Sequence, residues 1–409
     1  MKKVITLSIF IVSIMSTSCN DQATKEAKDN NYEKGTLGYD LQFLKQHDSS
    51  LIELKSGEAS VIISPKYQGK VFTSGASGNT GMSFGWINYK AFSAPLDPHM
   101  NAYGGENRLW LGPEGGKYSL YFNHGDSMVF NNWKTPPPID TEEWSTISAN
   151  ADSVILQKKM QLKNYTGSVL TMQVDREVTI LSKPGIEQVL SIELGDSIQF
   201  VGYATSNKLT NTGNEKWTEK TGMPCIWILD MFNPSAATTI VIPYKTSADN
   251  KKIATTDYFG EIPADRILLT GSTLYFKADG KKRGKLGIVP ESVLPVAGSY
   301  DATNNVLTIT SFTVDNTAKY LNQEWNTSKP VFSGDAMNSY NDGPLADSSQ
   351  MGPFYEIESV SPAAALNPGE TLLHDHNVYH FSGNKNQLNN ISKKILGVSL
   401  EEINNVFKK

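Results

Sequence analysis

The chain has 409 residues, of which 39% are hydrophobic and 19% are charged, and its formal net charge is -5. This length is sufficient for a large core, and the negative charge excludes the basic surface that nucleic-acid binding requires. Aromatic residues are frequent, with 17 Tyr, 16 Phe and 7 Trp. Together with many Asn, Thr, Ser and Gly residues, they are typical of exported β-rich proteins that handle carbohydrate.

The first 19 residues are typical of a signal peptide and are set apart from the fold. After two lysines, residues 4–15 form an apolar segment that is too short to span a bilayer. Small residues precede Cys19, as at a bacterial lipoprotein cleavage site, so we expect lipidation of Cys19, with plain secretion or a retained anchor as the alternatives. We therefore expect a lipid-anchored protein of a Gram-negative cell envelope, in the periplasm or on the outer-membrane surface.

Residues 20–36 are polar and predict a flexible tether, and residues 41–54 could form one short amphipathic helix. From residue 59 onward the hydrophobic pattern has a period of two, which predicts strands. These strands are expected at residues 60–64, 70–73, 118–122, 153–162, 168–181, 187–194, 198–204, 227–230, 238–243, 267–269, 274–277, 285–289 and 306–314. Strands this frequent predict an all-β sandwich, and the lack of a fixed internal repeat argues against a propeller.

The C-terminal end has a different pattern. Residues 387–396 are compatible with a helix that ends at Gly397, and a capping box from Ser399 to Glu402 opens a second short helix. We therefore expect a β-domain over residues 37–384 and a short helical tail over residues 385–409.

The most unusual segment is residues 99–116, where five glycines and a proline separate polar and charged side chains. So many turn-forming residues exclude a regular helix or strand through the whole segment. Its side chains suit a site for a polyhydroxylated ligand, although a structural crossover with a buried ion pair is the alternative. The candidate residues are His99, Asn101, Glu106, Asn107, Arg108, Trp110 and Glu114.

A second polar cluster lies in residues 334–344. Its Asp and Asn residues either form turns through bonds from side chain to backbone or bind hydroxyl groups or a hard cation such as calcium. The candidates in this cluster are Asn338, Tyr340, Asn341 and Asp342. Outside the cluster, Asn88 is a further ligand candidate, and Trp86 and Trp133 are candidate apolar platforms for sugar rings.

Two glutamates lie two residues apart in a predicted strand, so Glu356 and Glu358 project to the same face. Neighbouring carboxylates repel, which raises the pKa of one of them and suits it to acid–base work. A solvated edge strand is the alternative.

His374 and His376 likewise share one face of a late strand. Surface histidines are a simpler interpretation of this pair than a zinc site, so we assign no metal ligand.

The order of these features resembles the galactose mutarotase-like superfamily, whose fold is the β-supersandwich. Gly104-Gly105 leads to an apolar Gly-Pro segment, a late strand carries Glu358, and a Leu-x-Pro-Gly-Glu turn follows at residues 366–370. The run from Gly104 to Gly116 is similar to an uncharacterised family of bacterial lipoproteins thought to share that fold. The resemblance covers residues 36–385.

The resemblance implies an acid–base site for a sugar. In the epimerases a late-strand Glu is the general base, which corresponds to Glu358, with Glu356 as the alternative. In the epimerases the general acid is a His. From the residues of this chain we take His99 or Glu114 as the acid and Arg108 as the group that orients the ligand or stabilises charge. The leading hypothesis is a carbohydrate-active enzyme of the epimerase, hydrolase or lyase type that acts on a mono- or oligosaccharide. A non-catalytic glycan-binding lipoprotein and a structural envelope protein are the alternatives. No cofactor is required, and calcium is allowed for.

Overall fold

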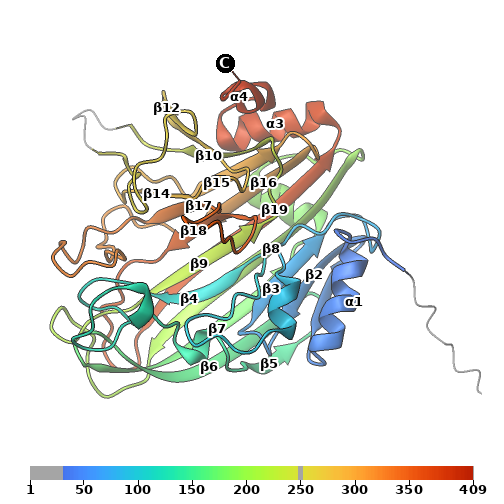
Figure 1. The fold of residues 1–409 in the computed structure, drawn as a ribbon. Helices are drawn as coiled ribbons and strands as arrows, with labels where there is room; N and C mark the ends of the chain where they lie inside the picture. Colours follow the sequence, from blue (N-terminus) through green and yellow to red (C-terminus); the bar gives the residue numbers. More distant parts are fainter. Residues whose placement is uncertain (1–30, 247–251, 409) are drawn as a thin grey trace, which may run out of the picture. The chain divides into compact units, whose positions relative to one another are not determined.

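The fold consists mainly of antiparallel strands, as the period-two pattern predicts (Figure 1). The structure is a computed structural model that describes residues 31–246 and 252–408. Contacts join the described residues from Tyr32 onward into one unit, so the last residues of the predicted tether and the C-terminal helices share this unit with the strands. The predicted signal peptide, with Cys19, and tether residues 20–30 lie outside the described residues.

The described strands form three sheets. The smallest has the order β1 (Ile52–Ser56), β2 (Ala59–Ser64) and β3 (Lys70–Gly75). The ten-stranded sheet has the order β12 (Ile267–Thr270), β13 (Thr273–Lys277), β10 (Thr238–Pro243), β15 (Val296–Asp301), β16 (Val306–Phe312), β19 (Thr371–Gly383), β8 (Ile198–Asn211), β7 (Val169–Ile180), β6 (Ser153–Lys163) and β5 (Ser145–Ala149). The six-stranded sheet has the order β11 (Ala254–Thr255), β14 (Gly284–Ile288), β17 (Met337–Asn341), β18 (Tyr355–Val360), β9 (Cys225–Phe232) and β4 (Arg108–Gly112).

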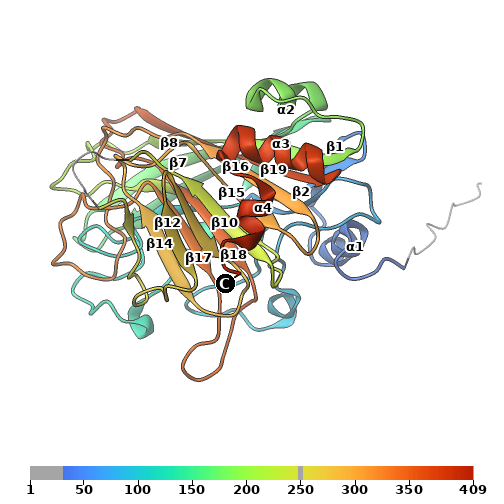
Figure 2. The same ribbon diagram turned by 90° about the horizontal axis from the view of Figure 1, so that it is seen from above.

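Helices are short and lie outside the sheets. The described α-helices are α1 (Leu37–His47), α2 (Lys183–Leu190), α3 (Lys385–Leu396) and α4 (Leu400–Asn405), and the 3-10 helices are η1 (Tyr89–Ser93), η2 (Phe130–Asn132) and η3 (Pro137–Ile139). Both α3 and α4 pack on the ten-stranded sheet at β10 and β15, as Figure 2 shows from above. Within the described residues, no helix combines the length and the apolar character that a bilayer span requires.

The six-stranded and ten-stranded sheets pack face to face around the main core, which confirms the predicted all-β sandwich. Alternation along β18 and β9 turns Ile357 and Ile228 into this core, where both are 0% exposed. Polar groups also cross it, because Asp230 on β9 lies 2.8 Å from Nε2 of His376 on β19. The opposite face of the six-stranded sheet is therefore turned away from the ten-stranded sheet.

The N-terminal helix lies four residues earlier than its apolar pattern suggested. Thr36 caps α1, since its hydroxyl accepts a hydrogen bond from the Tyr39 amide, and the helix ends before Asp48. Residues 52–56 pair with β2 instead of continuing the helix. The prediction of a helix over residues 41–54 was therefore wrong in its bounds, because the capping role of Thr36 was missed.

Two predicted strands are absent from the described structure. Residues 183–190 form α2 where a strand over residues 187–194 was expected, because Ser182 caps the helix and Pro184 occupies its first turn. Residues 118–122 are irregular: the Leu120 amide donates to Pro113 O and the Tyr121 amide to the Ser119 hydroxyl, so neither amide enters a ladder. In both segments, local caps and turns determine the conformation of the backbone and override the apolar alternation.

The two C-terminal helices were predicted correctly. Gly397 adopts a left-handed conformation at φ 76° and ends α3. Ser399 and Glu402 form the predicted capping box at the start of α4. Their apolar side chains, including Leu388 and Ile403, fill a second core against the outer face of the ten-stranded sheet.

Candidate active site

The register of the six-stranded sheet brings distant residues together on its outward face. Glu358 on β18 pairs with Asn338 on β17 and Leu229 on β9, and Leu229 in turn pairs with Arg108 on β4. One row further, Glu356 pairs with Tyr340, which pairs with Lys285 on β14. Paired residues of antiparallel strands project to the same side. We name this surface the carboxylate face; its members are Arg108, Trp110, Trp227, Lys285, Asn338, Tyr340, Glu356 and Glu358.

Glu356 and Arg108 form an ion pair that is almost fully buried. Their side chains are 10% and 9% exposed, and a terminal nitrogen of Arg108 donates to Oε1 of Glu356. Burial raises the pKa of Glu356, and the Glu358 carboxylate adds to this rise, while the Arg108 guanidinium opposes it. The predicted rise of one pKa in the carboxylate pair is therefore present, with desolvation as the larger cause.

Glu358 lies at the centre of the carboxylate face and is 0% exposed. Its Oε2 accepts hydrogen bonds from Nε1 of Trp227 at 2.8 Å and from Nζ of Lys285 at 3.0 Å. Its Oε1 is buried and has no partner among the described residues. A buried acceptor without a partner is costly, so this oxygen is left available to a hydrogen-bond donor.

Lys285 is the main site residue that sequence reasoning missed. Burial alone would lower the pKa of its ammonium group, but the carboxylates of Glu358, Glu114 and Glu356 together raise it. Its Nζ also lies 4.7 Å from the centre of the Trp227 ring. The available signal was a single lysine in an otherwise apolar strand, between Gly284 and Leu286.

Glu114 approaches the same group of charges from the loop that follows β4. Burial raises the pKa of its carboxyl group; Lys285 and the indoles of Trp325 and Trp133 oppose the rise, and Glu358 contributes to it. Its backbone amide donates to Oε1 of Gln323 at 3.2 Å. The structure therefore gathers the predicted Arg108, Glu114, Glu356 and Glu358 into one electrostatically connected cluster.

Aromatic rings surround this cluster. Trp110 lies 5.3 Å from the guanidinium carbon of Arg108 and meets Trp227 edge to face at 5.7 Å. Beyond it, the Trp133 ring is stacked with Tyr121 at 5.8 Å and with Trp325 at 6.0 Å. Trp110 and Trp133 are both buried, at 7% and 6% exposed, so the predicted role of these rings as platforms for a sugar stays a prediction.

His99 has partners other than the glutamates. Its Nδ1 lies 2.6 Å from the carbonyl oxygen of Trp133, and its ring is stacked on Phe130 at 4.6 Å. No contact between His99 and a carboxylate of the cluster occurs within the described part of the chain. These contacts give His99 a role in holding the loop with Trp133, so Glu114 is the better placed of the two acids considered.

Glu106 and Asn107 lie inside the sandwich and are 0% exposed. Glu106 accepts from the Ser74 hydroxyl at 2.8 Å and lies 3.1 Å from Nε2 of His380. Asn107 donates to Asp230 at 2.6 Å. The structure places both side chains in the core between the two sheets, where core groups bond Asn107 and one oxygen of Glu106, so neither lies on the carboxylate face with Arg108.

Three other predicted ligand residues stabilise turns. Asn101 donates to Asp140 at 2.8 Å. Asn341 accepts from the Gly280 amide at 2.9 Å and donates to Lys282 O at 2.8 Å, while Asp342 accepts from the Gly352 amide at 2.8 Å. For Asn341 and Asp342 these bonds fit the turn-forming alternative, and for Asn101 they give a structural role, so the predicted ligand-binding role of all three is corrected. Asn338 and Tyr340 do lie on the carboxylate face.

The late-strand histidines are buried rather than at the surface. Both His374 and His376 are 0% exposed and share the hydroxyl of Ser359, which lies 2.8 Å from Nε2 of His374 and 2.8 Å from Nδ1 of His376. Within residues 31–246 and 252–408, no group of three or more His, Cys, Asp or Glu side chains is arranged to hold a metal ion. These histidines serve the contact between the two sheets.

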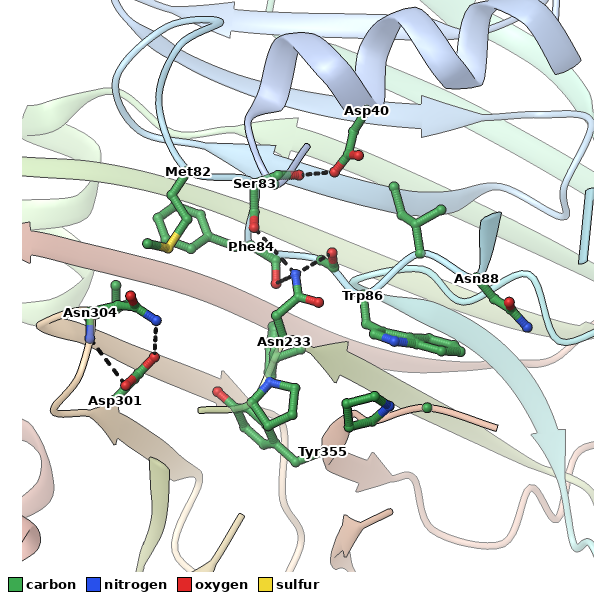
Figure 3. A pocket seen from close by; sticks show the side chains of 18 of the residues that line it. Asp40, Met82, Ser83, Phe84, Trp86, Asn88, Asn233, Asp301, Asn304 and Tyr355 are labelled. Carbon is green, nitrogen blue, oxygen red and sulfur yellow. Dashed lines mark hydrogen bonds between the residues drawn. The ribbon is translucent and has the colours of Figure 1, made fainter. Parts of the chain in front are cut away.

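Trp86 and Asn88 line a separate open cleft of about 750 Å³ (Figure 3). Asn233 and Gly85 both line this cleft, and the side-chain nitrogen of Asn233 donates to Gly85 O at 2.9 Å. Trp86 packs against Met231 and Phe354, and Met231 pairs with Glu356 in the sheet. The cleft therefore adjoins the carboxylate face but does not contain its glutamates.

Comparison with solved structures finds similar chains, each at low identity. A protein of Escherichia coli K12 that is provisionally assigned as an aldose 1-epimerase has 14% identity and a TM-score of 0.46, with 81% of this chain and 98% of that chain covered. A galactose mutarotase-like protein of Lactobacillus casei has 10% identity and a TM-score of 0.48, with 81% and 99% covered. A galactose mutarotase-related enzyme of Lactobacillus acidophilus has 8% identity and a TM-score of 0.44, with 82% and 97% covered. Because these scores and identities are low, the similarities assign no activity to this chain.

No curated protein matches the sequence significantly. A family model does match, over residues 35–407, which includes the sandwich and both C-terminal helices. The chain therefore belongs to the family of unknown function DUF6786.

Proposed function

We propose that the carboxylate face binds a saccharide and catalyses acid–base chemistry at its ring. The observation that carries this proposal is Glu358, a fully buried carboxylate with one oxygen held by Trp227 and Lys285 and the other without a partner. A carboxylate held in this way is pre-oriented to accept a proton from a bound hydroxyl group.

The acid partner in this proposal is Glu114. Its raised pKa keeps a larger share of the carboxyl group protonated near neutral pH than in an exposed glutamate. In a ring-opening reaction, Glu358 takes the proton of the anomeric hydroxyl while Glu114 gives a proton to the ring oxygen. The bond between the anomeric carbon and the ring oxygen breaks, a carbonyl forms, and the reverse transfer closes the ring. Arg108 stabilises the negative charge that develops on the anomeric oxygen as its proton leaves.

Exchange of anomers provides the test. Freshly dissolved pure anomers of several aldoses are followed by polarimetry and proton NMR with the wild-type protein and with Glu358→Gln and Glu114→Gln. We expect the wild type to accelerate exchange and each variant to lose about 10²–10⁴-fold of the acceleration. Product analysis on oligosaccharides separates epimerase from hydrolase and lyase activity. Full activity of Glu358→Gln in a folded sample would refute the assignment.

Non-catalytic glycan binding is the second candidate, and the stacked rings of Trp133 and Trp325 favour it. A thermal-shift screen with mono- and oligosaccharides, with and without calcium, reports binding through the rise in melting temperature. If sugars bind but anomer exchange is not accelerated, binding without catalysis becomes the function. A calcium-dependent shift would support the calcium that the sequence analysis allows for.

We further propose that the chain is exported and anchored to a Gram-negative envelope through a lipid on Cys19. The motif at residues 16–19 supports this proposal. Metabolic labelling with a fatty-acid analogue tests it: the wild type should be labelled and remain with membranes, whereas Cys19→Ala should be unlabelled. Equal labelling of both proteins would exclude lipidation at Cys19.

A further inference from the structure

A second buried cation lies next to Arg108, on the neighbouring strand β3. Lys70 is 4% exposed, and its Nζ has no ion pair or hydrogen bond to a described residue. Its nearest aromatic contact is the Tyr103 ring, whose centre lies 5.4 Å from Nζ. Burial lowers the pKa of Lys70 to about 7; the Arg108 charge contributes to this decrease, and the Asp140 carboxylate opposes it. Little of this lysine is exposed and no carboxylate of the described residues pairs with its ammonium group, so its position needs an explanation.

Lys70 and Arg108 line one small cavity. Its volume is about 10 Å³, near the lower limit for a single water-sized atom. Arg108 uses a terminal nitrogen for Glu356, but its Nε is buried and has no partner in the described residues. Two cationic groups therefore share a space that holds one oxygen atom.

The nearby carboxylate of Asp140 leaves this space to a ligand. Asp140 also lines the cavity, but it accepts hydrogen bonds from the backbone amide and the side chain of Asn101 at 3.0 and 2.8 Å. It forms no ion pair with Lys70 within the part of the chain that the structure describes. Asp140 and Lys70 attract each other at longer range, but the oxygens of Asp140 are bonded to Asn101, so the positive groups of Lys70 and Arg108 retain unused donors.

We propose that Lys70 and Arg108 bind the carboxylate of an acidic saccharide, a uronate, with one carboxylate oxygen in this cavity. The inference rests on the proposed function and specifies its substrate class. An oxygen between the two cations receives charge-assisted hydrogen bonds from both. Met351 lines this cavity and also the 750 Å³ cleft, and it is 41% exposed, so the rest of the saccharide has a route outward past a flexible side chain.

A singly charged carboxylate fits this setting better than a phosphate ester. Asp140 borders the cavity, and Glu356 is the ion-pair partner of Arg108, so an anion with two charges would meet stronger repulsion. Sugar phosphates therefore serve as the opposing probes.

The experiment measures binding by isothermal titration calorimetry with glucuronate, galacturonate, glucose, galactose and glucose 6-phosphate. For the wild type we expect a uronate to bind at least tenfold more tightly than its neutral parent sugar, with weaker binding at high salt. Lys70→Met should lose this preference while it retains the affinity for the neutral sugar. Lys319→Met, at a surface lysine whose side chain is 64% exposed, is the matched control and should behave as the wild type.

Thermal unfolding separates a binding role of Lys70 from a structural one. If the ammonium group serves a ligand, Lys70→Met fills the same space without a buried charge, and its melting temperature should equal or exceed that of the wild type. A lower melting temperature with an unchanged uronate preference would overturn the proposal. If Lys70→Met fails to fold, the sugar panel on the wild type still decides, because equal binding of uronate and neutral sugar, or tighter binding of the sugar phosphate, refutes a carboxylate subsite.

These outcomes are independent of the catalytic proposal. Calorimetry reports the anion preference even if Glu358→Gln retains full activity or if no exchange of anomers occurs. Conversely, acid–base catalysis on neutral sugars without a uronate preference would support the proposed function and remove only the carboxylate subsite.

Discussion

Lys285 and Glu358 form a 3.0 Å ion pair although strand β17 lies between their strands in the sheet. Glu358 is 0% exposed and the Lys285 side chain is 13% exposed. The pair therefore spans two strand spacings over the outward face and helps to hold one oxygen of Glu358 in place.

Removal of the ammonium group should leave an uncompensated buried charge. We expect Lys285→Met to lower the free energy of unfolding by about 3–5 kcal/mol, measured by urea denaturation. Lys319→Met is the control, since its ion pair with Glu219 is exposed and should contribute at most about 1 kcal/mol. The double variant Lys285→Met/Glu358→Gln should recover part of the loss. Equal stability of Lys285→Met and wild type would show that the pair has no such role.

Trp227 should matter for the orientation of Glu358 rather than for substrate affinity. Trp227→Phe removes the indole donor at 2.8 Å, so kcat should fall about tenfold while KM changes less than about twofold. Trp144→Phe is a matched control, because Trp144 is also buried and donates to Pro138 O at 2.8 Å outside the site. The measurement is steady-state kinetics on the best substrate. An equal loss of activity in Trp227→Phe and Trp144→Phe would contradict the assignment.

The pH profile should report Glu114. The group must be protonated to act as the acid, so the rate should fall as the pH rises through its raised pKa. Glu114→Gln should be slow at every pH and should lack this decrease. A decrease at high pH that persists in Glu114→Gln would assign the acid to another residue, and measurements of kcat/KM across pH 4–10 decide between the two.

Asp335 should make stability depend on pH. Burial raises its pKa from 3.8 to about 6, while hydrogen bonds from Tyr258 at 2.5 Å and Thr255 at 3.3 Å oppose the rise. Because the folded state then holds the proton more tightly than the unfolded state, stability should fall as the pH rises from about 4 to about 6, by up to about 3 kcal/mol.

Asp335→Asn should remove that dependence. The variant should match the wild type near pH 4 and exceed it at pH 8 in the free energy of unfolding by urea. Exposed Asp265→Asn serves as the control and should leave the curve unchanged. A parallel pH dependence in Asp335→Asn and the wild type would locate the linked proton elsewhere.

The features that sequence patterns predicted are local. Alternation placed Glu356 and Glu358 on one face, and the capping box of Ser399 and Glu402 located a helix. α2 was missed because the cap at Ser182 was overlooked in favour of apolar spacing. Within the site, Arg108 meets Glu356 across 248 residues of sequence. Such a contact depends on the order of strands in the sheet, and no local pattern records that order.

The sequence also does not show whether a polar side chain is already bonded to other groups of the protein. Glu106 and Arg108 are two residues apart in the same glycine-rich segment, yet Glu106 lies in the core and Arg108 on the carboxylate face. Both were expected to meet a ligand. Only the packing of His380 and Ser74 around Glu106 distinguishes them.

Strand β18 carries two functions on its two sides, since Glu356 and Glu358 face outward while Ile357 and Ser359 face the core. A deletion or insertion of one residue in this strand would exchange the two sets, placing charges in the core and apolar groups at the site. Among members of the family we therefore expect variation in chain length to accumulate in the loop over residues 343–353 and to be absent between residues 355 and 360.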